Sequence, residues 1–151
     1  LPAIDLMLDT WPYNAHTTAS DALWAGVPLV TCAGSTFASR VAGGLLRAAG
    51  LPEAVTTTPE AYAALALSLA RDPACLRDLR QRFAASRHAA ALFDVVAYTH
   101  ALEGMYTRMW ARHASGLPPE AIDMADDLPG FPAAAPRADW TLKLAWGKAG
   151  D

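Results

Sequence analysis

This sequence lacks cysteine clusters, metal-ligand motifs and long hydrophobic runs. Each absence argues against one class of protein, namely disulfide-stabilised, metal-binding and membrane-spanning proteins. The two cysteines, Cys32 and Cys75, are far apart in the chain, which argues against a disulfide framework and fits buried thiols in a reducing compartment. The four histidines are scattered and match no zinc-ligand spacing: His16, His88, His100 and His113. We therefore expect no metal site.

An excess of positive charge is also missing. The chain carries 12 Lys and Arg against 15 Asp and Glu, which gives a net charge of −3, and no Lys/Arg cluster stands out, so we expect no nucleic-acid partner. The longest apolar run, residues 61–70, is interrupted by Tyr62 and Ser68. It is far shorter than the roughly 20 residues that a membrane-spanning helix requires. We therefore expect a soluble protein with no membrane partner.

The size and composition are those of one globular domain, with 151 residues of which 53% are hydrophobic. The chain opens on Leu1 and Pro2, without a methionine, and reaches its first predicted strand within a few residues. A Rossmann-like lobe normally has several strand–helix units ahead of such a point. We therefore expect a piece of a longer polypeptide.

A strand, a tight loop and a helix start follow one another near the beginning of the chain. Residues 4–8 are short and apolar enough for a buried parallel strand. Thr18 and Asp21 have the spacing of a capping box, which predicts that a helix begins with Thr18 as its cap. Leu23 and Trp24 are expected on the inner side of this helix.

The predicted helix start suits a phosphate group, because its unpaired backbone N–H groups and partial positive charge attract anions. His16, Thr17 and Thr18 add side-chain donors at this point. Asp21 would repel a phosphate but can accept hydrogen bonds from sugar hydroxyls, so the four residues together suit a nucleotide diphosphate. The alternative is structural: Thr18 and Asp21 only cap the helix, and His16 pairs with a carbonyl of its own loop.

Three neighbouring side chains each have two interpretations. Trp11 and Tyr13 can stack on a base or a sugar, or they can pack the loop onto its own domain. Arg40 can reach a phosphate or an acidic group of the substrate, or it can pair with a carboxylate of a neighbouring lobe. These three residues therefore stay outside the predicted site.

A second strand–turn–helix unit follows the first. Residues 27–32 read as a strand parallel to residues 4–8, because a helix connects the two. The turn at residues 33–35 then lies on the same edge of the sheet as His16, where open α/β sheets bind their ligands. The next helix is predicted at residues 36–49. Its buried side is expected to carry three residues: Phe37, Val41 and Leu45.

The rest of the chain is predicted to be mainly helical. After a brief strand at residues 54–57, Thr58 and Asp72 each precede a proline, which is typical of a cap followed by the first helical residue. The longest helix is predicted at residues 94–114. Its core-facing stripe is expected to be Tyr98, Leu102, Met105 and Met109. Residues 117–151 are rich in proline, alanine and acid and read as an extended tail. A short strand is possible there around four residues: Trp140, Leu142, Leu144 and Trp146.

Two motifs carry a family resemblance: HTTASDALWAGVPLVT at residues 16–31 and TFASRVA at residues 36–42. They resemble the C-terminal catalytic lobe of the bacterial O-linked N-acetylglucosamine transferases of the family 41 type. These enzymes have the two-lobed glycosyltransferase B fold and are usually preceded by tetratricopeptide repeats. The resemblance runs from about residue 4 to residue 110 and is densest in its first third.

The resemblance implies an α/β fold. Parallel strands with helices would form the C-terminal part of a Rossmann-like glycosyltransferase B lobe, followed by a helical C-terminal segment and the extended tail. Residues 1–116 would belong to the nucleotide-sugar-binding lobe and residues 117–151 to the tail. The partners implied within the same polypeptide are the upstream catalytic lobe and the repeats.

The resemblance also implies an activity, namely transfer of N-acetylglucosamine from UDP-N-acetylglucosamine to serine or threonine hydroxyls of acceptor proteins, in the cytoplasm and without a cofactor. On the family motif, His16, Thr17 and Thr18 would contact the diphosphate, and Asp21 would accept hydrogen bonds from the ribose. The residues that act as base or anchor the uracil lie mostly upstream in this family. We therefore expect no certain catalytic residue in this chain, and no activity without the upstream lobe.

Two departures and two alternatives accompany the resemblance. Ala15 stands where the family commonly has glycine, and Ser35 stands where it commonly has glutamate. A UDP-N-acetylglucosamine epimerase of the same fold would use the same diphosphate contacts. A non-catalytic α/β interaction module would keep the motif only to cap a helix.

Overall fold

The computed structural model describes residues 4–122 of the chain. The chain divides into two compact units, Leu1–Val95 and Val96–Asp151. The predicted extended tail, with its possible strand around residues 140–146, lies almost wholly outside the described residues. The predicted boundary between residues 116 and 117 therefore stays a prediction.

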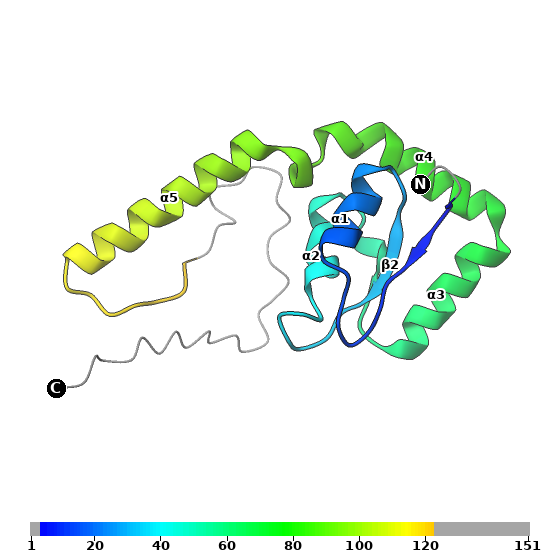
Figure 1. The fold of residues 1–151 in the computed structure, drawn as a ribbon, viewed down its shortest axis with the longest axis horizontal. Helices are drawn as coiled ribbons and strands as arrows, with labels where there is room; N and C mark the ends of the chain where they lie inside the picture. Colours follow the sequence, from blue (N-terminus) through cyan, green and yellow to red (C-terminus); the bar gives the residue numbers. More distant parts are fainter. Residues whose placement is uncertain (1–3, 123–151) are drawn as a thin grey trace. The chain divides into compact units, whose positions relative to one another are not determined.

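The first unit is an alternation of short strands and helices (Figure 1). Its elements, in chain order, are β1 (Met7–Leu8), α1 (Thr17–Trp24), β2 (Leu29–Cys32), α2 (Val41–Ala48), η1 (Pro52–Ala54), β3 (Val55–Thr56), α3 (Pro59–Arg71), α4 (Pro73–Ser86), η2 (Arg87–Ala89) and η3 (Ala91–Phe93). Here η denotes a short 3₁₀ helix. The order of strands and helices confirms the predicted α/β class.

The three strands form a parallel sheet in the order β1-β2-β3. All four residues of the central strand β2 are buried, as expected of a parallel strand that is covered on both faces. Because the strands run in the same direction, the segments that follow them (residues 9–16, 33–40 and 57–58) lie at one edge of the sheet. We call this the carboxyl edge.

Helices cover both faces of the sheet, with α1 and α2 on one side and α3 on the other (Figure 1). Their inward-facing residues form a single core. The largest fully buried members are Leu23, Leu29, Val30, Leu46, Leu51 and Phe83. Phe83 comes from α4, so this helix also contributes to the core of the first unit.

The first two strands are shorter than predicted. β1 has only the two residues that pair with β2, Met7 with Leu29 and Leu8 with Val30. The predicted burial of this strand is wrong at two positions, because Ile4 lies outside the ladder and is exposed, and Leu8 is exposed even though it pairs with Val30. β2 begins after Pro28, which lacks an N–H group and contributes only its carbonyl, as acceptor for the Met7 N–H at 3.0 Å.

The prediction of a helix at residues 36–49 is wrong in its first turn, because α2 begins at Val41. Residues 36–39 instead form a turn in which the Thr36 N–H donates to the Ser39 hydroxyl at 3.0 Å. Phe37 therefore lies outside the helix and is 73% exposed. Of the predicted stripe, Leu45 is partly buried and packs against the core. The fully buried positions of α2 are three small residues and one leucine: Ala42, Gly43, Leu46 and Ala48.

Two predictions of burial are also wrong. Trp24, expected on the inner side of α1, is exposed and packs edge-on against Phe93 with ring centroids 5.2 Å apart. Cys75, expected to be a buried thiol, is exposed near the start of α4, whereas Cys32 is buried in β2 as predicted. Both cysteines are free.

Helices α3 and α4 begin as the sequence predicts. The Thr58 hydroxyl accepts a hydrogen bond from the Ala61 N–H at 3.1 Å, and the Asp72 carboxylate accepts from the Ala74 and Cys75 N–H groups at 2.9 and 3.1 Å. In both helices a proline follows the cap. These two helix starts therefore satisfy backbone donors with their own side chains.

Helix α5 (Val95–Ala114) begins at the last residue of the first unit and otherwise belongs to the second, and it confirms the long helix predicted at residues 94–114. Gly116, with φ of 68°, ends it in the left-handed conformation. Tyr98 and Met109 of the predicted core stripe are exposed. No helix within residues 4–122 has the length and apolar character to span a bilayer.

Candidate functional site

The start of α1 lies at the carboxyl edge, and no side chain caps its free backbone N–H groups. His16 is the cap residue and makes no side-chain capping hydrogen bond. The first backbone bond of this turn runs from the Ser20 N–H to the His16 carbonyl at 3.1 Å. The N–H groups of Thr17, Thr18 and Ala19 come earlier in the chain than the Ser20 N–H, so they have no carbonyl partner within the helix and point out of its start.

The structure places three of the four predicted residues, His16, Thr17 and Thr18, at the start of α1, and Asp21 in its second turn. His16 is half-buried, whereas Thr17, Thr18 and Asp21 are exposed. The predicted capping box is wrong, because α1 begins at Thr17 and Thr18 is already its second residue. A cap must precede the helix for its side chain to reach the free amides, so Thr18 and Asp21 have no structural capping role here.

The His16 imidazole lies between two aromatic rings. Tyr13 stacks on it with ring centroids 5.1 Å apart and an interplanar angle of 19°. Phe37 meets it edge-on at 6.0 Å and 86°. The Nε2 atom lies 3.5 Å from the carbonyl oxygen of Ala38. The ring is therefore held at the surface and is not turned into the core.

The buried Asp9 carboxylate organises the loop at residues 9–16. Its Oδ1 accepts hydrogen bonds from the N–H groups of Thr10 at 2.8 Å and Ala15 at 2.7 Å. Its Oδ2 accepts from the Thr31 hydroxyl at 2.5 Å. Hydrogen bonds to a carboxylate are stronger than those between neutral groups. Asp9 therefore fixes the backbone immediately before His16 and ties it to the central strand.

Sequence reasoning missed this role of Asp9. The available signal was a carboxylate directly after an apolar strand, where a buried charge needs several donors. Ala15, which replaces the glycine common in the family, is accommodated because no non-glycine residue between 4 and 122 has a positive φ. The substitution therefore does not strain this loop.

The loop after β2, residues 33–40, contacts the loop after β1 at the carboxyl edge. Ala38 accepts a hydrogen bond from the Asn14 N–H at 3.0 Å in addition to its contact with His16. The Asn14 side chain is buried and donates to the Thr10 carbonyl at 3.0 Å. The loops after β1 and β2 are thus joined at Ala38, although 22 residues separate it from His16.

Helix α3 is joined to the same edge through Tyr62, whose hydroxyl donates to the Asp9 carbonyl oxygen at 2.8 Å. Burial raises the pKa of Tyr62 above its ordinary value, and the negative charge of Asp9 and the nearby Cys32 add to the increase. Tyr62 therefore stays protonated as a donor at neutral pH.

Arg40 is the nearest cationic side chain in the sequence to this turn, and the structure places it directly before α2. It is half-buried, precedes α2 as its cap residue, and already interacts with another part of the protein. Burial lowers the pKa of its guanidinium below the ordinary value, although an arginine stays charged in proteins.

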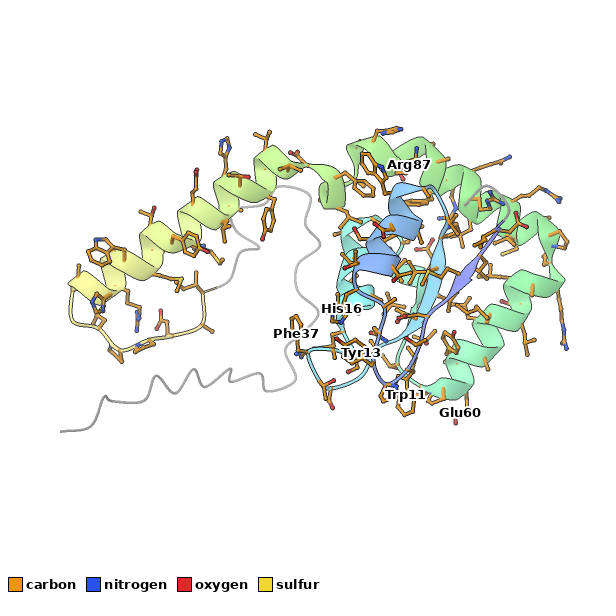
Figure 2. The ribbon with its side chains drawn as sticks, in the orientation of Figure 1. Trp11, Tyr13, His16, Phe37, Glu60 and Arg87 are labelled. Atoms are coloured by element: carbon orange, nitrogen blue, oxygen red, sulfur yellow. The ribbon has the colours of Figure 1, made fainter. Side chains whose placement is uncertain are left out.

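The labelled side chains in Figure 2 place Tyr13, His16, Phe37, Trp11 and Glu60 at the carboxyl edge, whereas Arg87 lies at the opposite end of the first unit. Residues 4–122 contain no cluster of three or more His, Cys, Asp and Glu side chains that could hold a metal ion. Helix-start amides, an imidazole and two hydroxyls at this edge are groups that can donate hydrogen bonds to an anion.

The chain resembles several known proteins. The family described as Glycosyl transferase family 41 matches residues 3–102. A UDP-N-acetylglucosamine--peptide N-acetylglucosaminyltransferase of Caenorhabditis elegans is 39% identical over 125 residues, which are 83% of this chain and 11% of that protein. A probable enzyme of the same name, SEC, from Arabidopsis thaliana is 39% identical over 129 residues, which are 85% of this chain and 13% of that protein. The chain thus spans little more than a tenth of these relatives.

A solved structure supports the same assignment. An O-GlcNAc transferase mutant of Thermobaculum terrenum is 44% identical, with a TM-score of 0.66 over 71% of this chain and 21% of that chain. This likeness confirms the predicted fold class, an α/β piece of a glycosyltransferase lobe. Because the family match covers well over half of its residues, the chain belongs to glycosyl transferase family 41.

Proposed function

We propose that this chain is the donor-binding part of a protein O-linked N-acetylglucosamine transferase, and that the start of α1 receives the diphosphate of UDP-N-acetylglucosamine. The observation that carries the proposal is the uncapped helix start beside the His16 imidazole. The related enzymes of Caenorhabditis elegans and Arabidopsis thaliana are named for UDP-N-acetylglucosamine as donor and a peptide as acceptor, which supports both parts of the proposal.

In the proposed reaction, a serine or threonine oxygen of the acceptor protein attacks the anomeric carbon of the sugar. The bond between that carbon and the phosphate oxygen breaks, UDP leaves with the bonding electrons, and the acceptor proton passes to a base upstream of this chain. Negative charge grows on the diphosphate as the bond breaks. Donors aimed at that charge lower the barrier, because hydrogen bonds to charged groups contribute roughly 1.5 to 3 kcal/mol each.

Each site residue has a proposed role. His16, Thr17 and Thr18 donate to the diphosphate together with the free amides of their turn. Asp21, one turn further along α1, accepts hydrogen bonds from the ribose hydroxyls. With these groups carrying the charge, the proposed reaction needs no cofactor. The upstream lobe supplies the remaining substrate contacts, and the proposed location is the cytoplasm.

Titration of UDP into the full-length protein tests the proposal. We expect His16→Ala to weaken UDP binding by about one to two orders of magnitude, because one hydrogen bond to a charged group is lost. The matched control is His88→Ala, which removes an exposed histidine of η2 and is expected to leave the affinity unchanged. Equal affinities of wild type and His16→Ala would remove His16 from the site.

Inorganic pyrophosphate separates the two halves of the proposed site. His16→Ala should weaken UDP and pyrophosphate alike, whereas Asp21→Ala should weaken only UDP, because pyrophosphate has no ribose. If the wild-type protein binds no UDP, the interaction-module alternative holds. If it converts the sugar of UDP-N-acetylglucosamine without transferring it to protein, the epimerase alternative holds.

A further inference from the structure

We propose that Tyr13 and Phe37 are positioning residues that hold the His16 imidazole in the orientation needed to bind the diphosphate, an inference that rests on the proposed function. We call these three side chains the ring cluster. Tyr13 comes from the loop after β1 and Phe37 from the loop after β2, so the cluster joins two segments of the carboxyl edge (Figure 2).

The geometry of the ring cluster is that of attractive aromatic contacts. Aromatic pairs prefer offset stacking or edge-to-face arrangements with centroids about 4.5–7 Å apart. The Tyr13–His16 pair is stacked at 5.1 Å, and the His16–Phe37 pair is edge-on at 6.0 Å. One ring lies against the face of the imidazole and the other meets it at a right angle. Together they restrict rotation of the imidazole about both side-chain torsions.

Hydrogen bonding alone does not fix this ring. The contact between His16 Nε2 and the Ala38 carbonyl is 3.5 Å long, which is beyond the usual range of an N–H···O bond. It nevertheless defines which edge of the ring faces protein. Within the described residues Nδ1 has no protein partner and makes no capping bond, so the Nδ1 edge is the one available to a ligand.

Exposure argues against a role of Tyr13 and Phe37 in the core. Tyr13 is 65% and Phe37 is 73% exposed, so neither ring buries enough area to contribute much to folding. Both are large apolar groups that project into solvent beside the proposed site. A side chain that is already held in its bound orientation loses less freedom when the ligand binds, and this is the benefit that the two rings provide.

The test is UDP titration into the full-length protein carrying single substitutions. Tyr13→Ala and Phe37→Ala are each expected to weaken UDP binding by about three- to tenfold, with an unchanged unfolding temperature. Tyr13→Phe keeps the stacked ring and should restore wild-type affinity. The matched control is Leu67→Ala, an exposed apolar side chain of α3, which should change nothing. Wild-type affinity in both alanine variants would overturn the proposal.

A double-mutant cycle shows whether Tyr13 acts through His16. In a His16→Ala background the ring has nothing to position, so adding Tyr13→Ala should cause no further loss of affinity. If Tyr13→Ala weakens UDP binding equally in both backgrounds, Tyr13 contacts the ligand directly and the positioning role is wrong. The same cycle applies to Phe37.

A measurement without ligand separates this inference from the proposed function. Stacked rings shift each other's NMR resonances, so the imidazole C–H signals of His16 in histidine-labelled protein should move on Tyr13→Ala and stay near their place on Tyr13→Phe. An unmoved signal in Tyr13→Ala would overturn the ring cluster alone. Absence of UDP binding by the wild-type protein would instead overturn the proposed function, and the ligand-binding role of the cluster with it.

Discussion

Helix α1 begins without a side-chain cap, whereas α3 and α4 each begin with one. Thr58 and Asp72 accept hydrogen bonds from the first-turn amides of α3 and α4, but His16 accepts none from α1. All three helices present the same backbone donors at their starts. The difference is that α3 and α4 satisfy some of these donors internally, and α1 leaves them to solvent or to a ligand.

The support beneath the helix starts differs as well. The caps of α3 and α4 are exposed side chains acting within one turn. The loop that leads into α1 is held by the buried Asp9, which accepts hydrogen bonds from that loop and from the central strand. The uncapped start of α1 therefore relies on tertiary contacts for its position. Three substitutions would test this difference between the uncapped start of α1 and the capped starts of α3 and α4.

Removal of the buried support should have the largest effect. Asp9→Ala leaves the Thr31 hydroxyl and the Thr10 and Ala15 N–H groups without their acceptor, so we expect the free energy of unfolding to fall by roughly 3 kcal/mol or more. Urea denaturation measures it. The matched control is Asp5→Ala, which removes an exposed carboxylate paired with Arg80 and should cost at most about 1 kcal/mol. Similar losses in the two variants would contradict the role given to Asp9.

Cap replacement should have an intermediate effect that distinguishes the helices. Asp72→Ala removes the acceptor for two amides of α4 and should destabilise that helix by about 1 kcal/mol. Thr18→Ala should change α1 by less than roughly 0.5 kcal/mol, because Thr18 caps nothing. Hydrogen exchange of the amides in each helix gives the local stabilities. A loss of protection in α1 on Thr18→Ala would restore the capping box that the structure excludes.

The smallest effect concerns the hydrogen bond that links α3 to the loop before α1. Tyr62→Phe removes the bond from α3 to the Asp9 carbonyl and should cost about 0.5 kcal/mol at neutral pH, at the low end for a hydrogen bond between neutral groups. Because the pKa of Tyr62 is raised in the folded protein, first by burial and then by Asp9 and Cys32, its contribution is complete below the unfolded value of about 10. It is lost as the pH rises through the folded pKa.

Stability curves between pH 7 and pH 11 check the Tyr62 prediction. The wild-type protein should lose stability more steeply above pH 10 than Tyr62→Phe, which has no hydroxyl to ionise at this position. Parallel curves for the two proteins would show that the hydrogen bond to Asp9 is not coupled to ionisation.

Local patterns in the sequence predicted the parts of the fold that depend on neighbouring residues. The caps at Thr58 and Asp72, each followed by proline, act over three residues and were predicted correctly. The parallel pairing was also predicted correctly, because a helix separates the apolar strands. The motif around His16 located the start of α1, and the roles of its four residues toward a ligand stay predictions.

Contacts between distant residues explain the errors. Phe37 has the spacing of a buried helical residue, yet the hydrogen bonds between Thr36 and Ser39 form a turn there and send its ring outward. Trp24 is apolar and lies on α1 beside the buried Leu23, but it finds its partner in Phe93 at the surface. Neither partner can be identified from local spacing.

The sequence by itself determined the α/β class, the parallel sheet, the family and the turn that carries His16, because periodicity, caps and motifs are properties of short segments. Only the tertiary structure decided that this turn is uncapped, that Asp9 supports it, and that Tyr13 and Phe37 enclose the imidazole. Those features join residues from separate loops and strands, and folding alone brings them within hydrogen-bond and van der Waals range.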